Sequence, residues 1–432
     1  MNDRHNLADY ILKSFSSAGA DMAECRITDT VKTEFYYQSG KVSMIRTNFD
    51  TSVSMKAVKD GKKGVTSTNS TAREVIDGCI EQTMTALLSS VPDDAEGICD
   101  VADMGKSERG ITVPDKEGMY EGLKAFLAES AEKYPTIKFD SVTVEHDAIT
   151  SLYRNSNGTD LVSSNGFYLF SPSFMAVRDG KTSSMNYTYA LANEVRTPFM
   201  DLGGTRMAIA DTERQIDTVP VEGKFEGDVI FTPACFESMF SSVVGNFMSD
   251  LPLINGTSIF KDSLGKKVAA DGFSIYSEPR NPDLPGGYFM TGDGYVAQNM
   301  PLIEDGVLKN FTIGRYASRK TGLKRSPCTG GNFVMAPGQT SLEEMISSVK
   351  KGLLVARFSG GEPGGSGDFS GVAKNSFMIE NGKITDAVSE TMISGNLAKF
   401  LLDIREISSE RVNTGDSILP WVKVSGIVVS GK

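Results

Sequence analysis

Histidine is nearly absent from this sequence, and the shortage restricts the chemistry available to the chain. Only His5 and His146 occur among 432 residues. A catalytic zinc site takes three protein ligands, usually including histidine, and two histidines in distant segments supply such a site poorly. Ser-His-Asp and Cys-His arrangements also need a histidine beside the nucleophile, so neither is expected. We interpret both histidines as surface or packing residues.

Cysteine is scarce as well, and long apolar runs are missing. The five cysteines are widely spaced, odd in number and never arranged as CxxC, a pattern typical of free thiols in a reducing compartment. These residues are Cys25, Cys79, Cys99, Cys235 and Cys328. No segment approaches about 20 uninterrupted apolar residues, and the N-terminus has no signal-peptide pattern. We therefore expect a cytoplasmic protein without a membrane span.

Positive charge is in deficit, which argues against direct contact with nucleic acid. The chain has 44 Lys and Arg against 55 Asp and Glu, a net charge of -11, and no basic run exceeds a pair. Nucleic-acid affinity rests mainly on Lys and Arg at the phosphates. The glycine-rich stretch GGEPGGSGDFSG, residues 360–371, lacks the order of a P-loop, and no GxGxxG follows a strand and opens a helix. Nucleotide binding is therefore not expected.

The pattern along the chain predicts an α+β fold in three parts. We expect an N-terminal α+β domain at 1–100, a central helix with an antiparallel sheet at 101–222, and a larger C-terminal mixed α/β domain with antiparallel strands at 223–432. Length alone favours more than one domain. In the first part a helix over 71–90 is expected to be capped by Ser70 or Thr71 and to bury Val75 and Met84 among others.

Turn dipeptides divide the strand-rich central part into hairpins. Asn157-Gly158, Asn165-Gly166 and Asp179-Gly180 each tolerate the positive φ angles of a two-residue turn. Two pairs of similar hairpins, AVKDGKK with AVRDGKT and IEDGVLKNF with IENGKITDA, are compatible with an internal duplication. Coincidence explains them equally well, because Asp-Gly and Asn-Gly are what such turns require.

The C-terminal part offers a helix and two glycine-rich segments as candidates for function. Residues 233–248 have the apolar spacing of a buried helix, interrupted by small polar residues. A loop longer than ordinary connections contains Pro285, Gly286 and Gly287, and a second segment contains Phe358, Gly360 and Gly361. These six residues are candidates for a peptide groove, with turn geometry as the alternative. A later helix should begin with a Ser341/Glu344 capping box and end at Gly352.

Four ordered blocks in the last two hundred residues resemble the TldD/PmbA family. They are KDSLGKKVAADGFSIYSEPRNPDLPGG, DGYVAQNMPLIEDGVLKNFTIGRYASRKTGL, GNFVMAPGQTSLEEMISSVKKGLLVARFSGG and FMIENGKIT. The likeness is strong from about residue 227 to the end and looser before it. The resemblance implies an α+β fold and a role in metal-dependent peptide hydrolysis.

The TldD branch of this family carries HExxxH on a helix, with a late cysteine as a third zinc ligand. In this sequence the matching segment is SSVVGN, so Ser241 and Asn246 stand at the histidine positions and Ser242 at the glutamate position. The segment at the cysteine position, SSERVNTGDSILPW, has no cysteine. Serine and asparagine are weak zinc ligands. Residues five apart in an undistorted helix point about 140° away from each other, so Gly245 is a candidate for a local break.

The resemblance therefore implies the PmbA/TldE branch, without catalytic residues, metal or cofactor of its own. Such a chain is expected to partner a TldD-like subunit that carries the zinc, to act on peptides, and to form a homodimer in isolation. Two alternatives stay open. One is a metallopeptidase that uses His146 and carboxylates, and the other is a non-enzymatic modulator that binds DNA gyrase.

Overall fold

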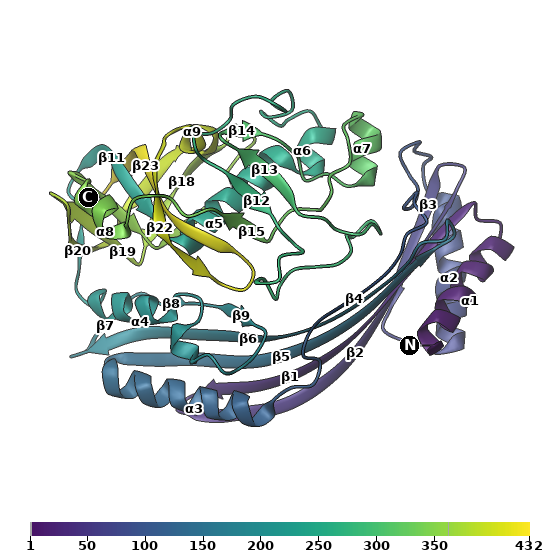
Figure 1. Ribbon diagram of the computed structural model, residues 1–432, viewed down its shortest axis with the longest axis horizontal. Helices are drawn as coiled ribbons and strands as arrows, with labels where there is room; N and C mark the ends of the chain where they lie inside the picture. Colours follow the sequence, from purple (N-terminus) through teal and green to yellow (C-terminus); the bar gives the residue numbers. More distant parts are fainter. Residues whose placement is uncertain (1, 362) are drawn as a thin grey trace.

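The computed structural model describes residues 2–361 and 363–432 and consists of a long curved sheet against which a second, more compact body packs (Figure 1). The order of the main strands in the curved sheet is β3-β2-β1-β5-β6-β4. Its strands are β1 (Met22–Gln38), β2 (Lys41–Lys59), β3 (Lys62–Thr68), β4 (Met104–Gly110), β5 (Ile137–Asn155), β6 (Asp160–Arg178), β7 (Lys181–Thr182), β8 (Asn186–Tyr187) and β9 (Ala190–Ala192). Only β4 pairs in parallel, with β6.

Two-residue turns join the long strands of this sheet, as their chemistry predicts. Asp60-Gly61 and Asp179-Gly180 have positive φ at both positions, so these hairpin predictions are confirmed. The turn predicted at Asn165-Gly166 is wrong, because both residues lie inside β6 and pair with β5. A glycine is needed there for another reason. A Cβ at position 166 would overlap the carbonyl oxygen of Ile111.

Helices pack against the curved sheet at both of its ends. They are α1 (Asn2–Ser17), α2 (Arg73–Ser89), α3 (Lys116–Lys133) and α4 (Thr205–Arg214), with a 3₁₀ turn at Phe199–Asp201. Helices α1 and α2 pack on one end of the sheet, whereas α4 lies between the sheet and the second body (Figure 1). The predicted cap of α2 is wrong, since Ala72 occupies that position without a side-chain bond. Val75 is exposed, while Thr83 and Leu87 are buried instead.

The second body is a twisted sheet of mostly antiparallel strands with short helices. Its strands are β10 (Thr218–Pro220), β11 (Lys224–Phe231), β12 (Ile275–Ser277), β13 (Met300–Glu304), β14 (Val307–Leu308), β15 (Phe333–Met335), β16 (Lys351–Val355), β17 (Arg357–Gly360), β18 (Asp368–Lys374), β19 (Ser376–Glu380), β20 (Lys383–Ser389), β21 (Met392–Asn396), β22 (Ile404–Asn413) and β23 (Ile418–Ser430). Its helices are α5 (Pro233–Val243), α6 (Asp250–Ile254), α7 (Arg315–Thr321), α8 (Leu342–Ser347) and α9 (Leu397–Leu402). The α+β prediction is confirmed.

Two local predictions in this body have different outcomes. The capping box of α8 is present, because the Ser341 hydroxyl accepts from the Glu344 N–H and the Glu344 carboxylate accepts from the Ser341 N–H. The predicted helix end at Gly352 is wrong, because α8 ends at Ser347 and Gly352 lies in β16. At Gly352 a Cβ would overlap the carbonyl oxygen of Asp228 on β11, so close strand pairing explains this glycine.

The strands show how the three expected parts relate to the two bodies. Strands from 1–100 and from 101–222 share the curved sheet, with β1 paired to β5 along its length. A boundary near residue 100 therefore does not separate two sheets. The chain enters the second sheet at β10, close to the boundary expected at residue 223.

The long loop that holds Pro285 to Gly287 is a seam between the two bodies. The guanidinium of Arg109 on β4 donates to the carbonyl oxygens of Pro279, Asn281 and Leu284, at 3.2, 2.8 and 2.7 Å. Because every one of these acceptors is main-chain, the arginine fixes the path of the loop. The loop therefore contributes to the contact between the two bodies.

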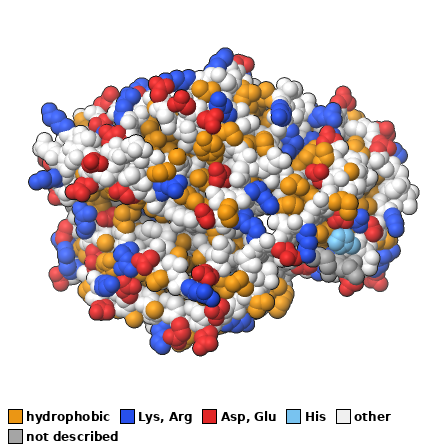
Figure 2. Space-filling view, viewed as in Figure 1, with side chains coloured by type: hydrophobic (Ala, Val, Ile, Leu, Met, Phe, Trp, Pro, Cys, Tyr) orange, Lys and Arg blue, Asp and Glu red, His pale blue; other side chains and the backbone are white. Residues whose placement is uncertain are grey.

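The surface carries mixed charge. Figure 2 shows Lys and Arg side chains interspersed with Asp and Glu over the visible face, with no broad area of basic residues alone. Among the described residues, no helix combines the length and the apolar character needed to span a bilayer.

Candidate functional site

Helix α5 is built by strong local signals in the segment that resembles the metal-binding helix. The Thr232 hydroxyl caps it by accepting from the Cys235 N–H at 3.4 Å, and Pro233 fits the first helical position. Phe236 and Phe240 are fully buried on its inner face and stack with ring centroids 6.0 Å apart. The predicted core-facing helix is confirmed.

A π-helical turn, Val244–Met248, follows α5 directly. The expected local break at Gly245 is therefore present, in the form of a widened turn. An i→i+5 turn brings residues five apart closer to one side of the helix than an α-helix does. Asn246 lies within this turn, whereas Ser241 and Ser242 lie in the last turn of α5, so the helix widens between the first and the second histidine position of the motif.

The side chains at the three motif positions do not fit zinc. Ser241 is exposed, the Ser242 hydroxyl donates to the Ser238 carbonyl oxygen at 3.2 Å, and the Asn246 amide donates to the Ser242 carbonyl oxygen at 2.9 Å. Protein zinc sites use thiolate, imidazole or carboxylate, and these groups are neutral hydroxyls and an amide. Within residues 2–361 and 363–432, no group of three or more His, Cys, Asp or Glu is placed to hold a metal ion.

The two histidines lie far from this helix, in the curved-sheet body. His146 is 1% exposed on β5, and its Nε2 lies 2.7 Å from the Ile111 carbonyl oxygen. Burial lowers the pKa of His146 and favours its neutral form. His5 on α1 lies 3.3 Å from the Asp160 carboxylate. Both are therefore packing or surface residues, as expected. The five cysteines are all free and buried.

The six candidate groove residues do not lie in one groove. Gly286 and Gly287 line a cavity at the seam together with Arg26 and Arg109, and Pro285 lines another. Phe358 lines a third cavity, described below. Gly360 pairs with Gly371 on β18, where a Cβ on Gly360 would contact the Ser370 carbonyl oxygen and the Phe358 ring. Close backbone approach explains the residue type at Gly287 and Gly360, whereas at Gly286 a Cβ would meet the side chains of Asp416 and Leu191.

A pair of partly buried carboxyl groups at α5 was not found from the sequence. Burial raises the pKa of Glu237 to about 7, although the hydrogen bond that the Ser417 hydroxyl donates at 2.8 Å lowers it. Burial also raises the pKa of Asp416, which accepts from Asn332 at 2.9 Å and from Tyr189 at 3.4 Å. Glu237 belongs to α5 and Asp416 precedes β23, so only tertiary structure brings the two together.

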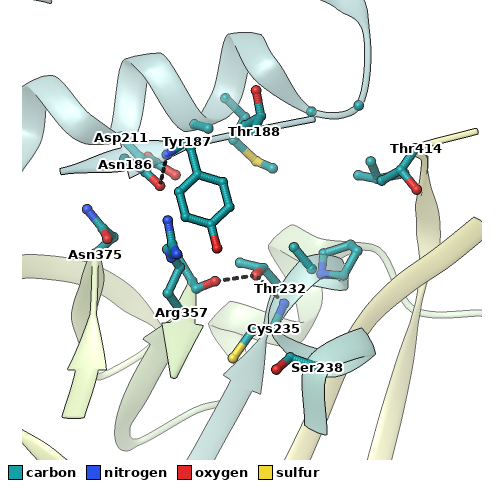
Figure 3. A pocket seen from close by; sticks show the side chains of 18 of the residues that line it. Asn186, Tyr187, Thr188, Asp211, Thr232, Cys235, Ser238, Arg357, Asn375 and Thr414 are labelled. Carbon is teal, nitrogen blue, oxygen red and sulfur yellow. Dashed lines mark hydrogen bonds between the residues drawn. The ribbon is translucent and has the colours of Figure 1, made fainter. Parts of the chain in front are cut away.

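A cavity of about 200 Å³ lies where the N-terminal end of α5 meets α4 and β8 of the curved-sheet body. Figure 3 shows side chains from several separate segments around it, including Tyr187, Asp211, Arg357 and Asn375. The Arg357 guanidinium lies 3.5 Å from the centroid of the Tyr187 ring. Sequence reasoning missed this cavity, because its residues are scattered over more than two hundred positions.

Two domain models of one family match the chain. The model described as PmbA/TldA metallopeptidase C-terminal domain matches residues 223–431, and the model described as PmbA/TldA metallopeptidase domain 1 matches residues 23–87. Together they cover more than half of the 432 residues. Metalloprotease PmbA of Escherichia coli O157:H7 is 23% identical over 440 residues, covering 95% of this chain and 94% of that protein.

Solved structures of two relatives show the same fold over nearly the whole chain. TldE from Thermococcus kodakarensis matches with a TM-score of 0.83 at 19% identity, covering 99% of this chain and 100% of that one. A protein from Bacteroides thetaiotaomicron described as a candidate modulator of DNA gyrase matches with a TM-score of 0.86 at 20% identity, covering 100% of both chains. Fold and sequence thus define a metallopeptidase-type protein, and the chain belongs to the PmbA/TldD family.

Proposed function

We propose that this chain is a zinc-free, PmbA/TldE-like subunit that completes or regulates a TldD-type zinc peptidase acting on peptides. The observation that carries the proposal is the set of neutral side chains at the three motif positions, with Ser241 and Ser242 at the end of α5 and Asn246 in the π-helical turn that follows. The helix keeps a widened turn at the second ligand position, while none of the three side chains is a usual zinc ligand. A scaffold of this kind has a use in peptide hydrolysis when a second subunit supplies the metal.

Exposed apolar side chains just after the turn support a partner on this side of the molecule. Leu251 is 70% exposed, and Ile259 and Leu264 are also exposed. A subunit docked on this side of the molecule would remove these three side chains from water. The proposed occupant is the TldD-like subunit.

Co-purification and peptide cleavage test the proposal. The isolated chain should bind no zinc and cleave no peptide, and it should increase or alter cleavage by a TldD-like protein from the same organism whose sequence carries HExxxH and a late cysteine. Leu251→Asp should weaken the association, whereas Val91→Asp, at an even more exposed apolar residue on the other body, should not. Stoichiometric zinc and cleavage by the isolated chain would contradict the proposal. Size-exclusion chromatography would show whether the chain alone is a homodimer.

Restoring the motif tests whether the scaffold could hold zinc. The triple variant Ser241→His, Ser242→Glu, Asn246→His should bind zinc only weakly, because two imidazoles leave the site without the thiolate that the resemblance implies as third ligand. Zinc content after dialysis measures this, with Ser242→Glu alone as the control. Tight binding by the triple variant would mean that a further ligand is already in place.

The two alternative functions have less support. A peptidase that uses His146 would need that residue in an open site, and the imidazole is buried against Ile111 with no metal-binding group of side chains around it among the described residues. The gyrase-modulator alternative rests on the name of a structural relative. A pull-down with purified gyrase, in the presence and absence of the TldD-like protein, would separate it from the peptidase role.

A further inference from the structure

The cavity at the N-terminal end of α5 contains a positive charge without a countercharge. Burial lowers the pKa of Arg357, and no carboxylate is among the groups that act on it. Its nearest titratable neighbours are the Tyr187 ring and the Cys235 thiol, and burial raises the pKa of that thiol to about 12, so the thiol stays neutral. Asp211, the acidic residue of the cavity wall, accepts instead from Arg214 at 3.2 Å.

An unsatisfied amide lies beside this charge. Asn375 is 4% exposed, and neither its Nδ2 nor its Oδ1 has a hydrogen-bond partner in the part of the chain that the structure describes. Buried polar groups are nearly always paired, so two unpaired atoms on one side chain point to an absent partner. Arg357 pairs with Lys374 across β17 and β18, which places Asn375 one residue from the position opposite Arg357. Both side chains line the same cavity (Figure 3).

The backbone adds a further favourable feature for an anion. Thr232, Pro233 and Ala234 of the cavity wall form the first turn of α5, an eleven-residue helix. Of the first-turn N–H groups, Pro233 has none and Cys235 donates to the Thr232 hydroxyl, so this turn offers the Ala234 N–H, and the helix dipole makes this end partly positive. The cavity also has an apolar part, formed by Met207, Ala208, Phe358 and Val412.

We propose that this cavity binds the C-terminal residue of a short peptide, with the α-carboxylate on Arg357. One guanidinium balances one carboxylate, whereas a phosphate would bring surplus negative charge to a half-buried site. A peptide terminus also presents an N–H close to its carboxylate, so it uses both the donor and the acceptor of Asn375. The apolar wall receives the terminal side chain. A volume near 200 Å³ admits one small residue in place of about six waters.

The pocket is separate from the vacated motif and from the proposed subunit role. Its residues belong to the isolated chain, and binding is measured without a partner subunit or zinc. A pocket of this kind would retain a peptide end, either of a substrate or of a product, at the junction of the two bodies. Failure of the subunit assay and failure of this binding assay are therefore distinguishable.

Isothermal titration calorimetry on the full chain tests the proposal with three probes: N-acetyl-Ala-Ala, its C-terminal amide, and free alanine. The acid should bind saturably, and the amide should bind at least about tenfold more weakly, because it lacks the charge that Arg357 meets. Free alanine should bind more weakly than the acid. If free alanine binds better, with the same dependence on Arg357, the carboxylate site stands and a free amino acid is its ligand.

Matched variants connect the binding to the named residues. Arg357→Gln should lose at least about tenfold in affinity and Asn375→Ala several-fold, while Arg405→Gln, which removes an exposed arginine paired with Asp403, should bind as the parent does. Melting curves establish that each variant is folded, and Arg357→Lys serves if the glutamine variant is not. The proposal is overturned if the acid shows no saturable binding, if acid and amide bind equally, or if Arg357→Gln has no effect.

Discussion

Glu237→Gln should stabilise this protein at alkaline pH, although it removes a native side chain from the functional helix. Burial raises the pKa of Glu237 to about 7 from an ordinary value of 4.5, and the negative charge of Asp416 adds to the rise. The fold therefore favours the protonated carboxyl. The contribution of protonated Glu237 to the unfolding free energy is fully present below pH 4.5, decreases as pH rises, and is lost above about pH 7.

The size of the effect follows from the difference between the two pKa values. A pKa difference of one unit corresponds to about 1.4 kcal/mol, so a rise from 4.5 to about 7 makes ionised Glu237 cost roughly 3 kcal/mol in the folded state. Glutamine is neutral at every pH and still accepts a hydrogen bond from the Ser417 hydroxyl through Oε1. The variant should exceed the unfolding free energy of the parent by less than about 1 kcal/mol at pH 5 and by up to about 3 kcal/mol at pH 8 to 9.

Urea unfolding at pH 5, 6, 7, 8 and 9 measures the difference between variant and parent, so that other titrating groups cancel. Glu132→Gln, at an exposed glutamate on α3, is the matched control and should show no such pH dependence. A constant difference between pH 5 and pH 9, or a Glu237→Gln variant that is less stable than the parent at pH 8, would refute the reasoning.

Three further substitutions test the packing described above. Arg109→Met should lower the unfolding free energy by about 2–4 kcal/mol, because three carbonyl oxygens lose their donor. Amide hydrogen exchange in residues 279–287 should also accelerate, and unchanged exchange would contradict the claim that Arg109 holds this loop. Gly64→Ala should destabilise by more than about 2 kcal/mol in urea, since its Cβ would overlap the Thr83 carbonyl oxygen. Gly78→Ala should instead stabilise the protein by about 0.5–1 kcal/mol, because a Cβ at this position of α2 meets no atom within 4 Å. A destabilised Gly78→Ala variant would contradict the open space described around this residue.

Elements whose signals are local could be predicted from the sequence. The Asp-Gly turns, the capping box of Ser341 and Glu344, and the helix over 233–248 depend on residues within a few positions of each other. Side-chain periodicity and turn chemistry suffice for these, because the interactions that form them have short sequence separation. The break at Gly245 also followed from the sequence, through the angle between positions five apart.

Predictions failed where a distant segment decides what a residue does. Asn165-Gly166 has the composition of a turn, but pairing with β5 extends through it, and the Asn165 amide donates to the Pro285 carbonyl oxygen of the other body at 3.0 Å. Gly352 has the position of a helix end, but close pairing with β11 requires it to be glycine. Short-range propensity is a weak preference that tertiary pairing overrides.

The sequence by itself determined that neutral side chains stand at Ser241, Ser242 and Asn246, and that histidine is too scarce for the usual nucleophilic and zinc chemistries. It also determined the family resemblance, because ordered blocks along one chain need no third dimension. Only the tertiary structure decided that the helix widens into a π-turn, that Glu237 lies near Asp416, and that Arg357 and Asn375 line the same cavity. Burial and pairing depend on which segments meet in space, and a linear pattern does not contain that information.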